Sequence, residues 1–171
     1  MGIFLKDINL KGKTALVTGA TKGIGRGTAV ALAQAGANII AIGRNQIQLD
    51  SLKKIILKLR VNYHSFNCDV NNYELLKEYI SKLKKLDILV NNAGTNIPEP
   101  FLNVKQSSME TILNVNTKAV FNVAQLCANK IIKLNKKNGS IINISSIFGI
   151  VAGQNRSVYS MTKFGVEGLT R

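Results

Sequence analysis

Tyr159 and Lys163 are the two side chains whose types and spacing most directly suggest acid–base chemistry. They lie four residues apart in "SVYSMTKFGVEGLTR" (157–171), a stretch typical of a helix, and would therefore share one helix face. Tyrosine has an unperturbed pKa of about 10 and transfers protons poorly near neutral pH. A neighbouring ammonium stabilises the phenolate and lowers that pKa. The pair is a candidate proton-transfer group, although the same spacing is also common on solvent-exposed helices.

Two other polar side chains stand out against apolar surroundings. The segment "GSIINISS" (139–146) places Ser146 at the end of an apolar strand, and Asn116 falls within a helical stripe that contains Ile112 and Val123. An amide on a buried stripe must be hydrogen-bonded, because an unpaired buried polar group is costly. Asn116 is therefore either a structural asparagine or part of a polar site, and the sequence alone leaves both interpretations open.

The stretch "TGATKGIGRG" (18–27) is a glycine-rich turn between an apolar strand and an alanine-rich helix. Glycines at 19, 23 and 25 would allow a tight turn and let the backbone approach a pyrophosphate at the helix N-terminus. The spacing differs by one residue from the GxGxxG fingerprint, and no Gly-Lys-Ser/Thr follows, which excludes a P-loop. Close helix–strand packing without a ligand is the alternative explanation.

The ends of the next three expected strands carry further candidates for binding a dinucleotide. At the end of the second strand an acidic residue selects NAD, whereas an arginine accommodates the 2′-phosphate of NADP. "IGRN" (42–45) has Arg44 and no acidic residue, and Lys22 would add a second cation; an ordinary surface arginine is the alternative. In "CDV" (68–70), Asp69 could bind the adenine amino group and Val70 could pack on the ring.

The motif "NNAG" (91–94) ends the fourth expected strand. Asn92 could hold neighbouring loops in place, while Ala93 and Gly94 leave room for a flat ligand. Taken singly, each of these residues is no more than a turn signal.

These candidates require a scaffold that places strand ends together. Apolar strands alternate with helical patterns, which predicts a doubly wound parallel α/β sheet, Rossmann-like, in one domain over 1–171. In such sheets ligands bind beyond the carboxyl ends of the strands, at the switch point of the strand order. The expected strands are 14–19, 38–43, one within 62–70, 86–94 and 139–146, and the expected helices are 46–60, 73–85, 107–134 and one from about 157.

Composition indicates an ordinary globular protein: 46% of the 171 residues are hydrophobic and 19% are charged. The formal charge of +14 raises a nucleic-acid hypothesis, but the lysines alternate with apolar residues at helical spacing or close helices, including Lys136 and Lys137. We interpret them as solvated helix faces and expect no nucleic-acid partner.

No apolar run approaches the roughly 20 residues of a membrane helix, and "MGIFLKDINLKGKTALV" lacks secretory and myristoylation signals. Cys68 and Cys127 form no CxxC pair, and His64 is the one histidine. We therefore expect a reduced, cytoplasmic protein with no membrane association and no bound metal.

Together the motifs resemble the short-chain dehydrogenase/reductase (SDR) family, whose fold is the NAD(P)-binding Rossmann fold. "TGATKGIG" resembles the family's TGxxxGIG loop, "NNAG" its fourth-strand motif and "YSMTK" its YxxxK motif. Ser146 lies thirteen residues before Tyr159, the family's usual serine position, and Asn116 matches the catalytic asparagine.

The resemblance implies a role for each of these residues. Ser146 would bind the substrate carbonyl oxygen, Tyr159 would transfer the proton, and Lys163 would bind the nicotinamide ribose and lower the tyrosine pKa. Asn116 would hold a water molecule in a proton relay. The implied cofactor-binding residues are Thr18, Gly19, Thr21, Lys22, Gly23, Ile24, Gly25, Arg44, Asp69, Val70, Asn92, Ala93, Gly94, Tyr159 and Lys163.

The implied function is hydride transfer between NADP(H), with NAD less favoured, and a small ketone or secondary alcohol, in a homo-oligomer. "NNAGTNIPEP" and "IGRN" look most like the tropinone-reductase-like or sugar-acid reductase branches, with ketoacyl-carrier reductases as the alternative. Family members continue beyond this point with two more strands and a substrate loop, so we expect an N-terminal fragment of a reductase. A dinucleotide-binding fragment without turnover is the competing hypothesis.

Overall fold

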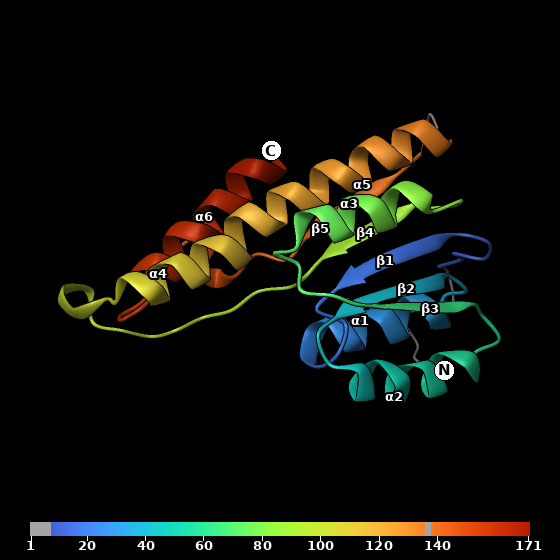
Figure 1. Cartoon of the computed structure of the whole chain (residues 1–171), viewed down its shortest axis with the longest axis horizontal. Coiled ribbons are helices and arrows are strands. Elements are labelled where there is room, and N and C mark those ends of the chain that lie inside the picture. Colours follow the sequence, from blue (N-terminus) through green and yellow to red (C-terminus); the bar gives the residue numbers. More distant parts are fainter. Residues whose placement is uncertain (1–7, 136–137) are drawn as a thin grey trace.

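The computed structural model describes residues 8–135 and 138–171 and contains a parallel sheet in the order β3-β2-β1-β4-β5 (Figure 1). The start of the N-terminal segment and the two lysines at 136 and 137 lie outside the described residues. The chain winds outward from β1 to β3 and then returns to the other side of β1, so the order reverses between β1 and β4. The strands are β1 (Thr14–Thr18), β2 (Asn38–Gly43), β3 (Tyr63–Asn67), β4 (Ile88–Asn91) and β5 (Ser140–Asn143).

Helices cover both faces of this sheet, which confirms the predicted α/β class (Figure 1). One face packs against α1 and α2, and the other against α3 and α5. The helices are α1 (Gly23–Gln34), α2 (Gln46–Leu57), α3 (Tyr73–Lys82), α4 (Gln106–Leu113), α5 (Ala119–Asn135) and α6 (Ser157–Thr170), with short turns η2 (Phe101–Asn103) and η4 (Ile147–Gly149).

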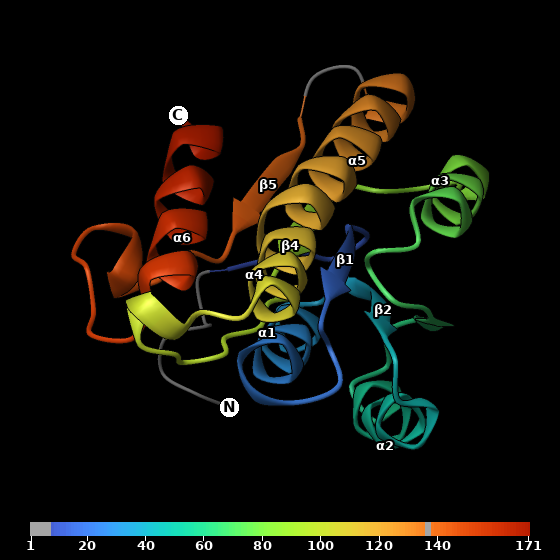
Figure 2. The same ribbon diagram turned by 60° about the vertical axis from the view of Figure 1, so that its left-hand side comes forward.

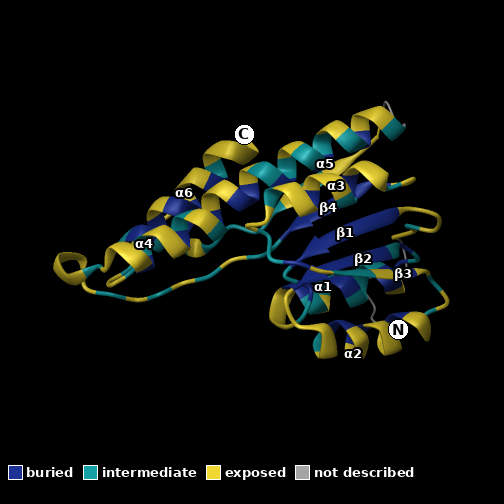
Figure 3. Cartoon of the chain, viewed as in Figure 1, coloured by how far each residue is buried: buried dark blue, intermediate teal, exposed yellow. Residues whose placement is uncertain are grey.

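The middle positions of the central strands are apolar (15–17 in β1, 39–42 in β2 and 88–90 in β4), because both faces of these strands are buried (Figure 3). In β1 the side chains alternate: Ala15 and Val17 pack toward α1 and α2, while Leu16 packs toward α3 and α5. At the edge of the sheet, β5 alternates exposed and partly buried residues. Within the described residues, no helix combines the length and the apolar character needed to cross a bilayer.

The helical region expected over 107–134 differs from a single regular helix. A π-helical turn, η3 (Asn114–Lys118), joins α4 to α5, and the backbone N–H of Ala119 bonds to the carbonyl of Asn114. Such a turn inserts one residue into the helix and re-aims its side chains. Asn116 lies within it and is fully buried.

The apolar layers predict a sharp contrast between a buried and an exposed side chain of similar size. Leu89→Ala on β4 removes a fully buried side chain and should lower the free energy of unfolding by about 2–5 kcal/mol. Ile47→Ala on α2, where the side chain is 82% exposed, should change it by no more than about 0.5 kcal/mol. Urea unfolding followed by circular dichroism measures both, and equal losses would contradict the described core.

Candidate functional site

The turn between β1 and α1 has the geometry of a backbone anion site. Gly19 and Gly23 adopt φ of 63° and 55°, in the left-handed region that favours glycine. Asn45 caps α2 and Asn72 caps α3 through side-chain hydrogen bonds, but no side chain caps the N-terminus of α1. The first N–H groups of α1 are therefore not used by a capping side chain and are available to an anion, which the helix dipole also favours.

Thr18 and Asn92 fasten this turn to the end of β4. The Thr18 hydroxyl oxygen accepts the backbone N–H groups of Asn92 and Ala93, each at 3.0 Å. The Asn92 side-chain amide donates to the carbonyl oxygens of Thr18 at 2.9 Å and Gly19 at 3.3 Å. Side-chain hydrogen bonds thus hold the ends of β1 and β4 together at the switch point of the sheet, beyond the last backbone-paired residues, Val17 and Val90.

A groove of about 610 Å³ runs along the carboxyl ends of β1 to β4, within the size range of small-molecule sites. It brings together most of the residues predicted to bind a dinucleotide. The predicted residues that line it are Gly19, Thr21, Lys22, Gly23, Ile24, Arg44, Asp69, Val70, Asn92, Ala93 and Gly94. Thr18 and Gly25 are buried, and Tyr159 and Lys163 are not part of its lining.

Arg44 and Asp69 form an ion pair across the groove, with the guanidinium Nη1 3.3 Å from the carboxylate Oδ2. Their side chains are 79% and 39% exposed, so the pair contributes little to stability and Arg44 can reorient toward an anionic ligand. Cys68 lines the same groove, and burial, together with the charge of Asp69, raises the pKa of its thiol. A thiol kept protonated is a weak nucleophile, so the buried Cys68 is better described as a small packing side chain than as a nucleophile.

Asn116 connects the loop after β4 to α6. Its Oδ1 accepts the Thr95 N–H at 2.8 Å, and its Nδ2 donates to the Thr95 carbonyl at 2.8 Å and to the Thr162 hydroxyl at 3.3 Å. The buried amide is therefore satisfied by protein groups, as the structural interpretation of this residue requires. The same bonds place it beside the predicted site, and a role for Asn116 in that site stays a prediction.

Lys163 is buried on α6, with 4% of its surface exposed, and its Nζ donates to the carbonyl of Ile144 at 2.7 Å. Burial lowers the pKa of this ammonium, since desolvation disfavours the charged form. Its Nζ lies 5.7 Å from the centre of the Tyr159 ring. The predicted Tyr–Lys pair therefore lies together on the inner side of α6.

Gly94 is where the groove meets these polar groups. A Cβ built at Gly94 would lie 3.4 Å from Asn116 Oδ1 and 3.8 Å from Lys163 Nζ. A side chain here would fill the space between the groove and the Tyr–Lys pair. A ligand lying along the groove can therefore reach Lys163 at this end.

Ser146 lies at the end of β5, before η4, and its hydroxyl oxygen accepts the Phe148 N–H at 3.2 Å. The Phe148 ring contacts the Tyr159 ring edge to face, with centroids 6.2 Å apart. Ser146 and Tyr159 thus belong to one local cluster joined through Phe148.

Comparisons with known proteins agree with this arrangement. A family model described as short chain dehydrogenase matches residues 13–171. The chain belongs to the short-chain dehydrogenase family. It is 36% identical over 168 residues to a 3-oxoacyl-acyl-carrier-protein reductase of Thermotoga maritima, covering 96% of this chain and 68% of that protein.

Two solved structures of the family superimpose closely on the chain. Carveol dehydrogenase of Mycobacterium avium, in complex with NAD, gives a TM-score of 0.90 at 28% identity and covers 95% of this chain and 65% of its own. A candidate NAD(P)-dependent gluconate 5-dehydrogenase of Beutenbergia cavernae, with NADP bound at low occupancy, gives a TM-score of 0.89 at 29% identity. The match covers 96% of this chain and 66% of that protein. The chain therefore spans about two thirds of the length of these relatives.

The groove also contains residues that the sequence did not single out. Gly43 precedes Arg44 at the end of β2, and a Cβ at Gly43 would lie 2.5 Å from the methyl carbon of Thr21. Its place at a strand end could have identified it from the sequence as a groove residue. The same holds for Thr95, which directly follows "NNAG". Thr111 and Val115 line the far wall, but they belong to α4 and η3, and no sequence pattern pointed to them.

Two glycines of α1 should respond in opposite directions to alanine. A Cβ at Gly25 would collide with the Asn92 amide and the Gly19 carbonyl, whereas a Cβ at Gly27 meets nothing within 4 Å. Gly25→Ala should lower the free energy of unfolding by about 1–3 kcal/mol through overpacking. Gly27→Ala should raise it by about 0.5–1 kcal/mol, because alanine favours a helix. Urea unfolding measures both, and a neutral Gly25→Ala would refute the close approach of α1 to Asn92.

Proposed function

We propose that this protein is an oxidoreductase that transfers hydride between NADP(H) and a ketone or secondary alcohol. The supporting observation is the continuity at Gly94: the groove that fits a dinucleotide ends within reach of Lys163 and Asn116, beside Tyr159. The proteins similar to this chain include a 3-oxoacyl-acyl-carrier-protein reductase and a carveol dehydrogenase, and both names describe carbonyl or alcohol chemistry.

The residues along the groove would bind the cofactor in a defined direction. The uncapped N-terminus of α1 and the turn at Gly19 and Gly23 would donate N–H groups to the pyrophosphate. Asp69 and Val70 would contact the adenine, and Ala93 and Gly94 would leave space for the ribose. The bound nicotinamide supplies the hydride or accepts it.

Arg44 and Lys22 favour NADP over NAD in this proposal. Both side chains are exposed at the adenosine end of the groove, and the first residue after β2 is an arginine where an acidic side chain would select NAD. Since solved family members contain NAD in one case and NADP in another, the choice depends on such local residues.

The acid–base groups would act at the other end. Ser146 would donate a hydrogen bond to the substrate oxygen, and Tyr159 would give or take the proton there. Lys163 would bind the ribose and stabilise negative charge that develops on the phenol oxygen. The side chain of Asn116 is already bonded to Thr95 and Thr162, so its proposed contribution to a proton relay would include holding this loop in place.

We also propose that copies of the chain associate and that α5 and α6 take part. Phe121 on α5, and Met161 and Phe164 on α6, are about half exposed. Burial of these apolar side chains against a second copy would favour association.

The cofactor preference can be tested with Arg44→Asp. Removing the guanidinium and adding a carboxylate should weaken NADPH binding about tenfold to a hundredfold, the range of one charge-assisted hydrogen bond. NADH binding should change far less, because NADH has no 2′-phosphate. Nicotinamide fluorescence in titrations measures both affinities, with the exposed Arg60→Asp as the charge-matched control. Equal weakening of NADPH and NADH would contradict the proposed preference.

The reaction can be tested with Tyr159→Phe, which removes the phenol oxygen and keeps the ring. Oxidation of NADPH by a panel of ketones (cyclohexanone, ethyl acetoacetate and L-xylulose), followed at 340 nm, should fall about a hundredfold to ten-thousandfold. NADPH affinity should stay within about twofold, since the ring packing is retained. An unmodified chain that binds NADPH yet reduces none of these ketones would favour a binding module without turnover.

A further inference from the structure

Arg156 immediately precedes α6 and has a buried nitrogen without a partner. Its Nη1 exposes less than 1 Å² and makes no hydrogen bond within the described part of the chain. Arg156 as a whole is only partly buried, so the side chain keeps some access to solvent. A buried donor on a permanent cation is costly unless an acceptor is supplied, which makes this atom an exception that needs an explanation.

Arg156 is the N-cap residue of α6 and lies one helical turn before the proposed acid–base pair. Tyr159 and Lys163 follow it by three and seven residues, the spacing of neighbours on one side of a helix. This side faces inward, since Ser160, Lys163 and Val166 are all buried. Tyr159 is about 4.5 Å further along the helix axis. The guanidinium is thus attached one turn away from the phenol that would transfer the proton.

Within the part of the chain that the structure describes, no carboxylate forms an ion pair with Arg156. Glu99 is tied to the same turn, because its backbone N–H donates to the Asn155 carbonyl at 3.2 Å. Its carboxylate oxygens, however, accept the Lys105 N–H and the Ser108 hydroxyl, each at 3.1 Å. Among the described residues, the second buried polar atom without a partner, the Ser160 hydroxyl, lies one turn later on α6.

We propose that Arg156 binds a carboxylate of the substrate, so that the substrate is a small oxo acid or hydroxy acid. This inference rests on the proposed function and specifies its substrate class. The planar guanidinium matches the two oxygens of a carboxylate, and a single arginine offers a single compensating charge. Because Arg156 precedes Tyr159 by one helical turn, the bound carboxylate would lie within a few carbons of the reacting carbon.

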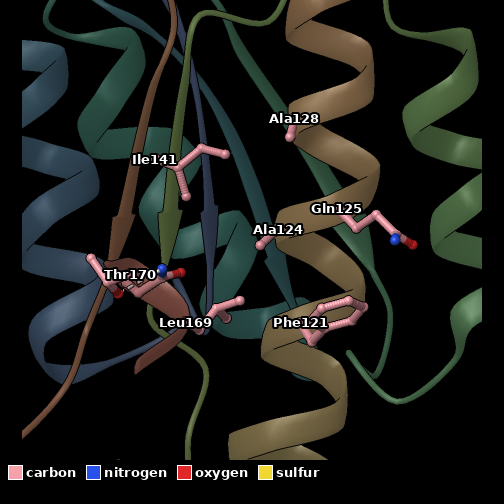
Figure 4. A pocket seen from close by; sticks show the side chains of 8 residues that line it. Phe121, Ala124, Gln125, Ala128, Ile141, Leu169 and Thr170 are labelled. Atoms are coloured by element: carbon pink, nitrogen blue, oxygen red, sulfur yellow. Dashed lines mark hydrogen bonds between the residues drawn. The ribbon is translucent and has the colours of Figure 1, made fainter. Parts of the chain in front are cut away.

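Neighbouring segments offer apolar side chains for the carbon chain of such a substrate. The η2 and η4 segments lie near the start of α6 in Figure 2. Phe101 on η2, Ile147 on η4 and Ile150 directly after η4 are exposed. The groove between α5, β5 and α6 in Figure 4 is a different feature, because it is lined by Phe121, Ile141 and Leu169 and by no predicted site residue.

The test compares each acid with its uncharged ester. The probes are 4-oxopentanoate and 5-oxohexanoate and their methyl esters, titrated against the 171-residue chain with and without NADP⁺ and followed by saturation-transfer NMR. At least one acid should bind about tenfold tighter than its ester, as expected for one charge-assisted hydrogen-bonded pair. Arg156→Met should abolish that preference and leave ester binding and NADPH fluorescence titrations unchanged.

Two further variants keep the result interpretable. Arg156→Lys retains the charge without the planar guanidinium and should retain part of the preference for the acid over its ester. Arg60→Met removes an exposed arginine elsewhere and should leave that preference unchanged. Equal binding of acid and ester by the unmodified chain, no binding of either, or a preference that survives Arg156→Met would overturn the inference. Failure of the unmodified chain to bind NADPH would refute the proposed reaction separately, because the comparison of acid and ester is also made without cofactor.

Discussion

The bonds between Thr18 and Asn92 are the constraint on which the rest of the structure depends. Parallel strands can leave their carboxyl ends apart, but here one hydroxyl accepts two N–H groups from the neighbouring strand end, and one amide returns two bonds to the glycine turn. Gly25 has no side chain because the Asn92 amide occupies that space. The sheet's switch point, the entry of α1 and one wall of the groove are therefore fixed by the same few atoms.

A second set of hydrogen bonds begins at Thr95, three residues after Asn92, and fixes the position of the acid–base groups relative to the groove. Thr95 holds the side chain of Asn116, which reaches Thr162 on α6, and Lys163 on the same helix donates to Ile144 after β5. The short segment from Asn92 to Thr95 therefore connects the proposed cofactor end to the proposed proton-transfer end. Because these bonds are buried or partly buried, they are strong where water is excluded, and they define the relative position of two functions.

Much of this was predictable from sequence because short-range rules determine it. Alternating strands and helices, glycines before α1 and polar residues at strand ends predicted the sheet, the groove and most residues that line it. The π-helical turn at Asn116 was not predictable, because it depends on bonds to Thr95 and Thr162 that join distant segments. The pairing of Arg44 with Asp69 was missed for a similar reason: each residue was assigned separately to a ligand, whereas their mutual distance is a property of adjacent strand ends.

The central claim is that the groove at the carboxyl ends of β1 to β4 binds a dinucleotide through the backbone of the glycine turn. Amide chemical-shift mapping during titration with NADP⁺ tests it most directly, with 2′,5′-ADP locating the adenosine end. Chemical-shift changes are expected at Gly19, Gly23, Arg44, Asp69 and Gly94, and 2′,5′-ADP should reproduce those at Arg44 and Asp69. Shifts confined to the groove between α5 and α6, or none at saturating NADP⁺, would contradict it.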